Sequence, residues 1–192
     1  MCGSTGDERL LARAVPFVVM TEQAAVWRMT AEKWTEVADA IGDDDWSKPT
    51  TCDDFTVREL VDHAMHWQAM GGGIVGAGTS PGDAWDDVRP ALSAALEDPS
   101  NLEGTAEAFG GMPKQVVLGL LITDLLVHSW DLARSLGVDD TLPPAAVEAA
   151  FIGLQRMPED QLRGGGMFAP AVEVADDASA QDRLIAFTGR RP

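Results

Sequence analysis

Apolar residues recur along this chain mostly at the spacing of amphipathic helices. Between residues 21 and 41, Trp27, Trp34 and Ile41 are separated by seven positions, and an alanine stands three positions before each of them. Side chains at this spacing line one face of a helix. The segment predicts the first long helix of a bundle, ending at Gly42.

The next helix has the clearest start in the chain. Thr56 and Glu59 form an S/T-x-x-E capping box, and Phe55 and Leu60 occupy the two hydrophobic staple positions around it. A known starting residue also determines which way each later side chain points.

Counted from this start, the inward face of the second helix carries a histidine. The predicted stripe consists of Leu60, His63, Trp67 and Met70. His66 lies on its flank. Gly71–Gly73 and the further glycines up to Gly78 are expected to end the helix in a flexible connection, since no GKS/T follows them to make a phosphate loop.

A long helix is predicted from Lys114 to Leu136, with Gly137 as its C-cap. Inside its apolar run, Asp124 and His128 stand four residues apart, so both side chains leave the same face of the helix. A second apolar surface covers another side. Such a helix should be buried on most sides, and the polar groups inside it need partners.

Shorter elements complete an all-α pattern. Further helices are expected at 84–96, at 143–157 and, capped by Ser179, up to Gly189, with irregular segments at 101–112 and 159–166. Strand alternation is not convincing beyond a short extended piece at 171–174. The 192 residues suit one domain spanning 1–192, most simply a four-helix bundle with additional short helices.

Composition limits the partners. The chain has 14 Lys and Arg against 31 Asp and Glu, and its formal net charge of −17 would repel the phosphates of a nucleic acid. The longest apolar run, 116–122, is far shorter than the roughly 20 residues of a membrane helix. Cys2 and Cys52 have no metal-ligand spacing and are expected to stay reduced. We therefore expect a soluble, cytoplasmic protein without nucleic-acid or membrane partners. Whether the protein forms a homodimer is not decided by the sequence, because no apolar stripe is long enough to argue for one.

The histidines supply the candidate chemistry. Asp124 and His128 by themselves are better explained as a buried hydrogen-bonded pair than as ligands. With His63 also predicted to face inward, metal ligands become the better explanation. Two imidazoles and one carboxylate leave coordination positions for water or substrate, as a catalytic metal site requires. The sequence therefore predicts a divalent metal site at His63, Asp124 and His128.

Two further residues have open roles. His66 is a fourth ligand, a general acid/base near the metal or an exposed polar residue, and we name it as the catalytic candidate. Asp131 lies three residues past His128 and can orient its imidazole. A salt bridge from Asp131 to Arg134 or Arg183 is an equal alternative.

Two stretches resemble a known family. The pattern T-x-C-x-x-F-T-V-R-E-L-V-x-H at Thr50–His63 is followed by D-x-x-x-H-x-W-D-L-A-R at Asp124–Arg134. Together they resemble the DinB-like superfamily, specifically the mycothiol-dependent maleylpyruvate isomerase N-terminal type and its short actinobacterial metal-binding relatives. The ending at Phe168–Arg190 is similar to that of the short relatives. The resemblance implies a four-helix bundle that holds a divalent metal at one end, through residues matching His63, Asp124 and His128.

The chain also departs from the isomerase type. That type usually has Glu where this chain has Asp124, and it carries an additional C-terminal domain that 192 residues are too few to hold. Maleylpyruvate isomerisation itself is therefore not the expected reaction.

The leading hypothesis for function is a metal-dependent transferase or isomerase. Zn²⁺ first, then Ni²⁺ or Fe²⁺, would bind the three ligands, and a low-molecular-weight thiol such as mycothiol would be deprotonated there for transfer to, or isomerisation of, a small electrophile. The alternative is a non-catalytic bundle that binds a metal or small ligand, favoured by the scarcity of acid/base groups. A two-His-one-carboxylate iron oxygenase shares the ligand set but is more typical of β-scaffolds.

Overall fold

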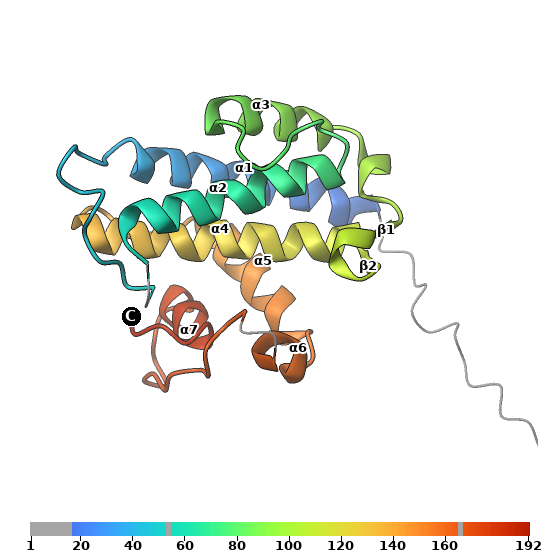
Figure 1. Ribbon diagram of the computed structural model, residues 1–192. Helices are drawn as coiled ribbons and strands as arrows, with labels where there is room; N and C mark the ends of the chain where they lie inside the picture. Colours follow the sequence, from blue (N-terminus) through green and yellow to red (C-terminus); the bar gives the residue numbers. More distant parts are fainter. Residues whose placement is uncertain (1–16, 53–54, 165–166) are drawn as a thin grey trace, which may run out of the picture.

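The computed structural model describes residues 17–52, 55–164 and 167–192, and these form an all-α protein (Figure 1). The helices are α1 (Phe17–Ala38), α2 (Val57–Ile74), α3 (Trp85–Ala95), α4 (Lys114–Leu136), α5 (Pro144–Gln155), α6 (Glu159–Gly164) and α7 (Ala180–Phe187). Between α3 and α4 lie the 3-10 turns η2 (Pro99–Leu102) and η3 (Glu107–Phe109) and the two-residue antiparallel strands β1 (Thr105–Ala106) and β2 (Met112–Pro113). The predicted fold class is confirmed.

The three long helices lie lengthwise beside one another. In Figure 1, the axes of α1, α2 and α4 are roughly parallel, and α3 packs against α1 and α2. The helix α5 packs against α4 and α1, but it descends across their direction before the chain reaches α6 and α7. The bundle is therefore built on α1, α2 and α4, with α3 and α5 covering two of its sides.

The central helix α4 has the predicted bounds. It ends at Gly137, whose φ of 71° is a left-handed conformation that glycine adopts at little cost. From Leu121 to Ala133, every residue except Asp124 is fully buried. Among the described residues, α4 alone is long and apolar enough to cross a membrane, with a mean hydropathy of 1.6. Because 83% of that apolar window is buried inside the molecule, we interpret α4 as a core helix.

The start of α2 is confirmed. The Thr56 hydroxyl accepts a hydrogen bond from the backbone N–H of Glu59, and the Glu59 carboxylate accepts one from the backbone N–H of Thr56 at 2.8 Å. Both halves of the capping box are thus formed, which leaves fewer unpaired N–H groups in the first turn.

The buried face of α2 is rotated from the predicted stripe. Leu60, Ala64 and Gln68 are fully buried, whereas His63 is only half-buried. Gln68 can point inward because its side chain accepts from Trp27 Nε1 at 3.0 Å and donates to the Leu121 carbonyl at 2.9 Å. Since those partners come from α1 and α4, the pattern of α2 alone did not place Gln68 inside.

The prediction that the glycines between 71 and 78 end α2 is confirmed only in part, because the helix continues through Gly71–Gly73 and ends at Ile74, before Gly76. A Cβ on Gly71 would lie 2.4 Å from Leu121 Cδ1, and one on Gly72 would lie 2.2 Å from Thr79 Oγ1. These glycines are required for close approach of α4 and of the returning loop, so they pack a helix instead of breaking it.

Smaller differences concern element ends. The first helix begins at Phe17 instead of residue 21, the predicted irregular segment 101–112 contains β1 and the first residue of β2, and 159–166 contains α6. Cys2 lies outside the described residues.

Candidate metal centre

Three polar side chains from two helices converge between α2 and α4. Asp124 Oδ1 lies 3.5 Å from His63 Nε2 and 3.4 Å from His128 Nε2. The two imidazole rings stand nearly perpendicular, with their centroids 5.1 Å apart. One ligand atom from each residue lies within 4.8 Å of the others. The structure therefore brings together the three residues that the sequence nominated as ligands.

The spacing of these atoms suits a shared cation better than direct hydrogen bonds. Good N–H···O bonds span about 2.7–3.2 Å, and both separations from Asp124 Oδ1 are longer. Ligand atoms about 2.0 Å from a tetrahedral Zn²⁺ stand about 3.3 Å from one another. In addition, Asp124 Oδ2 is buried and has no hydrogen-bond partner among the described residues. An orphaned carboxylate oxygen inside a His-rich cluster fits a divalent cation.

One side of the cluster faces solvent. The side chains of His63 and Asp124 are 31% and 26% exposed, whereas that of His128 is only 6% exposed. The centroid of the His63 ring lies 5.2 Å from that of Phe55 and 6.2 Å from that of Trp67. A ligand would therefore reach the cluster past His63, between aromatic side chains.

Mutual attraction among the charges shifts the pKa values of the cluster. Burial by itself would lower the pKa of His128, but the negative charge of Asp124 and the hydrogen bond that the ring donates to Asp131 raise it to about 9. Burial would likewise raise the pKa of Asp124, yet His128 and His63 hold it well below its ordinary value. Without a metal ion, the cluster thus carries a proton on His128 that compensates a carboxylate.

Asp131 determines how the His128 ring is oriented. His128 Nδ1 lies 2.9 Å from Asp131 Oδ2. Burial would raise the pKa of Asp131, but the hydrogen bond from His128 and the nearby Arg190 charge keep it below its usual value, so this carboxylate only accepts. Nδ1 must then donate, which leaves Nε2 directed toward Asp124. Of the two roles considered for Asp131, orientation of the imidazole is the one that the geometry shows.

The cation beside Asp131 is Arg190, which the sequence reasoning missed. Arg190 Nε donates to both carboxylate oxygens of Asp131, at 2.8 and 2.9 Å, and Thr51 Oγ1 donates at 2.8 Å. The two arginines weighed from the sequence pair elsewhere, Arg134 with Asp140 and Arg183 with the Asp176 carbonyl. Arg190 is 59 residues from Asp131, so helical spacing offered no signal for it.

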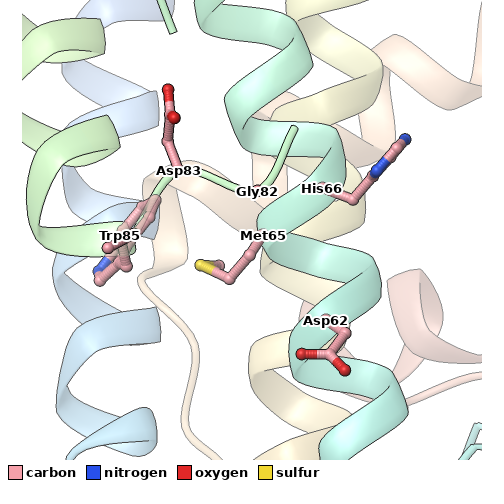
Figure 2. Close-up of a pocket in the computed structure, with 7 residues that line it drawn as sticks. Asp62, Met65, His66, Gly82, Asp83 and Trp85 are labelled. Carbon is pink, nitrogen blue, oxygen red and sulfur yellow. The ribbon is translucent and has the colours of Figure 1, made fainter. Parts of the chain in front are cut away.

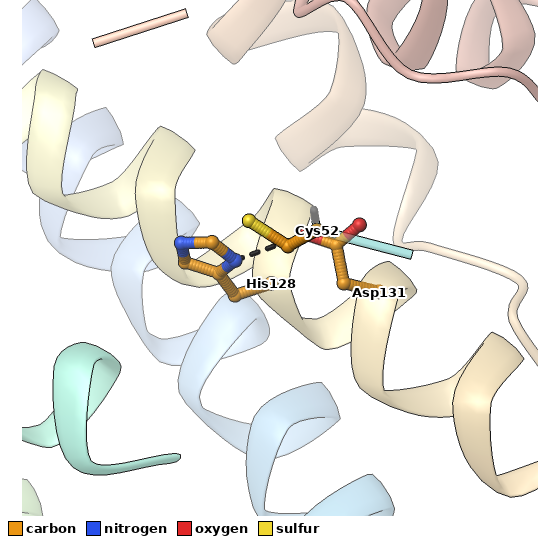
Figure 3. A group of neighbouring side chains, drawn as sticks. All are labelled: Cys52, His128 and Asp131. Carbon is orange, nitrogen blue, oxygen red and sulfur yellow. Dashed lines mark hydrogen bonds and ion pairs between the residues drawn. The ribbon is translucent and has the colours of Figure 1, made fainter. Parts of the chain in front are cut away.

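A second group of possible ligand atoms consists of Cys52, His128 and Asp131 (Figure 3). Its geometry is less suited to a metal ion, because Asp131 already holds a guanidinium and its Oδ2 is hydrogen-bonded to His128 Nδ1. We therefore interpret this group as the support of the His128 ring, and the first group as the candidate site.

His66 lies outside both groups. It is exposed one turn along α2 from His63, and its ring packs 5.5 Å from that of Trp67. It lines the edge of a separate hollow of about 390 Å³ together with Met65, Asp62 and Trp85, and Figure 2 shows its ring pointing away from Met65 and Trp85. The structure therefore does not bring this catalytic candidate to the three ligands.

Fold and site together define a helical bundle with a His–Asp–His cluster between two core helices. Residues 27–95, from α1 to α3, match the family model of the mycothiol maleylpyruvate isomerase N-terminal domain. This match confirms the family resemblance seen in the sequence. It includes His63, whereas Asp124 and His128 lie beyond it.

Mycobacterial proteins are similar over a longer stretch. Two uncharacterized proteins of Mycobacterium tuberculosis, from strains CDC 1551 / Oshkosh and ATCC 25618 / H37Rv, are each 28% identical to this chain over 151 residues. The alignments cover 74% of this chain and 83% of each relative. No solved structure matches significantly.

Proposed function

We propose that this protein binds one divalent metal ion through His63, Asp124 and His128 and uses it in chemistry on a low-molecular-weight thiol. The observation that carries the proposal is the convergence of the three ligand atoms at 3.4 and 3.5 Å around Asp124, whose second oxygen is buried without a partner. Two nitrogens and one oxygen suit Zn²⁺ first, and Ni²⁺ or Fe²⁺ after it.

The thiol is proposed from the family. The matching domain is named for mycothiol-dependent isomerisation, and the relatives are mycobacterial. A divalent ion at the site would lower the pKa of a bound thiol and so supply the thiolate, which is the nucleophilic form. The substrate is then a small electrophile, in the cytoplasm where such thiols are kept reduced.

The chain's own residues prepare this chemistry. Asp131 holds the His128 imidazole so that Nε2 faces Asp124, and the 31% exposure of His63 leaves the ligand set open on one side. Phe55 and Trp67, which flank His63, keep that opening apolar. An open coordination position beside an apolar wall is suited to a small molecule.

A non-catalytic metal-binding or ligand-binding bundle is the second candidate. The position of His66 favours it, because this exposed residue borders a different hollow and the described residues place no further histidine near the ligands. His66 as general acid/base remains a prediction that needs an activity to test it.

Metal binding is tested by elemental analysis and titration of protein purified without a histidine tag. We expect about one equivalent of bound metal, and His63→Ala should lose it. His66→Ala is the matched control, since it removes an exposed imidazole from the same helix and should keep the metal. Uptake below about a third of an equivalent, or equal loss in both variants, would refute the site.

The thiol is tested separately on protein loaded with Co²⁺. Mycothiol should produce a sulfur-to-cobalt charge-transfer band in the near ultraviolet, because a thiolate ligand adds such a transition. Metal binding without this band, and without consumption of thiol when an electrophile is added, would favour the non-catalytic candidate.

A further inference from the structure

The pair Asp131–Arg190 joins the segment after α7 to the C-terminal part of α4. Arg190 contacts both carboxylate oxygens, and its second guanidinium nitrogen lies 2.8 Å from Asp131 Oδ2. The Asp131 side chain is wholly buried, and that of Arg190 is 12% exposed. Bidentate pairs of this kind fix geometry as well as charge.

The backbone after α7 is shaped to deliver this side chain. Gly189 has φ of 90°, and a Cβ there would lie 2.5 Å from Ala169 Cβ. The turn is closed by the Arg190 N–H, which donates to the Ile185 carbonyl at 3.2 Å. The guanidinium is thus held against α4 by a turn that only glycine permits.

We propose that Arg190 is a positioning residue for the metal centre, acting through Asp131 on His128. Among the described residues, the Asp131 carboxylate accepts hydrogen bonds from three groups, which are His128 Nδ1, Thr51 Oγ1 and the Arg190 guanidinium. Arg190 contacts both oxygens of the carboxylate and Thr51 contacts Oδ1, so together they fix the carboxylate that accepts from His128 Nδ1 and thereby holds Nε2 toward Asp124. The proposal rests on the proposed metal site, and it adds the C-terminal segment and the 50–52 loop to that site.

An electrostatic role and a positioning role of Arg190 predict opposite changes in metal affinity when its side chain is removed. Removing a cationic side chain near a cation site would, by charge alone, strengthen binding of the cation. Removing a group that orients a ligand through hydrogen bonds weakens binding, commonly by 10- to 100-fold for the partner in direct contact. Weaker metal binding by the variant would therefore mean that the His128 ligand is less well oriented, because the loss of positive charge alone would strengthen binding.

The experiment compares Arg190→Ala with Arg191→Ala on the full-length protein, using Co²⁺ alone as the probe. Arg191 is exposed and adjacent, so it is a matched control for loss of one cation. We expect the Co²⁺ affinity of Arg190→Ala to fall about tenfold, with an altered visible absorption spectrum, and that of Arg191→Ala to stay unchanged. Arg190→Lys keeps the charge but not the fork, so it should restore part of the affinity.

A double-mutant cycle distinguishes action through Asp131 from a general loss of structure. Asp131→Asn and Arg190→Ala should be strongly non-additive in Co²⁺ affinity, because both break the same link. If Arg190→Ala does not fold, Arg190→Lys and the milder Thr51→Val carry the test, each with an expected loss of affinity. A wild-type protein that binds no Co²⁺ refutes the metal site and this proposal with it. A different outcome refutes this proposal alone. In that outcome the wild-type protein binds Co²⁺, and the Arg190 variants bind it with unchanged or stronger affinity and the same spectrum.

Discussion

At the scale of single residues, the structure turns a helical spacing into a defined cluster. Asp124 and His128 share a face because they are four positions apart on α4, and His63 reaches them from the edge of α2. The buried Oδ2 of Asp124 and the pairing of Asp131 with Arg190 could not be deduced from spacing. Both depend on which atoms of other elements lie nearby.

The raised pKa of His128 predicts that metal binding releases a proton. With a pKa of about 9, His128 is protonated at pH 7.5 in the metal-free protein. A metal ion must displace that proton from Nε2, so the apparent affinity should rise about tenfold per pH unit up to about pH 9 and then level off. Isothermal titration calorimetry in buffers of different ionisation enthalpy counts the protons released.

His66→Ala serves as the control for proton release, since an exposed histidine away from the ligands should not change the count. Metal affinity that is independent of pH between 7 and 9 would contradict the protonated state of His128.

At the scale of elements, capping motifs predicted the helix boundaries better than glycines inside a helical pattern did. The capping box at Thr56 and the glycine after Leu136 mark the ends of α2 and α4 as expected. Within the glycine-rich stretch 71–78, Gly71–Gly73 still belong to α2, because the same residue type can serve a turn or a close helix contact. Only the neighbouring side chains decide between these uses.

Alanine substitutions at two helical glycines test this packing explanation, because they should change the free energy of unfolding in opposite directions. Gly72→Ala places a methyl group 2.2 Å from Thr79 Oγ1, which already donates to the Ala69 carbonyl. We expect a loss of about 1–2 kcal/mol in the free energy of unfolding, as overpacking outweighs the gain in helix propensity. Gly153→Ala in α5 meets nothing within 4 Å and should gain about 0.5–1 kcal/mol.

Urea denaturation of both variants measures the difference. A stabilising Gly72→Ala would mean that the loop carrying Thr79 yields without cost, and it would remove the packing explanation for this glycine.

At the scale of the whole molecule, the centre collects residues from distant parts of the chain. Thr51 precedes α2, Asp131 lies near the end of α4, and Arg190 follows α7. Much of the net charge of −17 lies elsewhere, on exposed carboxylates that can hold cations weakly. A test at this scale must therefore separate specific from diffuse binding of a metal.

Thermal unfolding makes that separation. A ligand that binds only the folded state at 100 times its Kd adds about 2.7 kcal/mol, which for a chain of this size corresponds to a rise in Tm of roughly 5–10 °C. We expect this rise with Zn²⁺ for the wild-type protein and little of it for His128→Ala. An equal rise in both proteins would assign the binding to surface carboxylates.

The sequence by itself determined the all-α class, the bounds of α4, the start of α2 and the three candidate ligands. These follow from local rules, since helical periodicity, capping and the i, i+4 relation act between residues close along the chain. Only the tertiary structure decided the rotation of α2, the packing role of Gly71–Gly73 and the choice of Arg190 as partner of Asp131. Each of these depends on atoms brought together from separate elements, and burial makes those contacts energetically decisive.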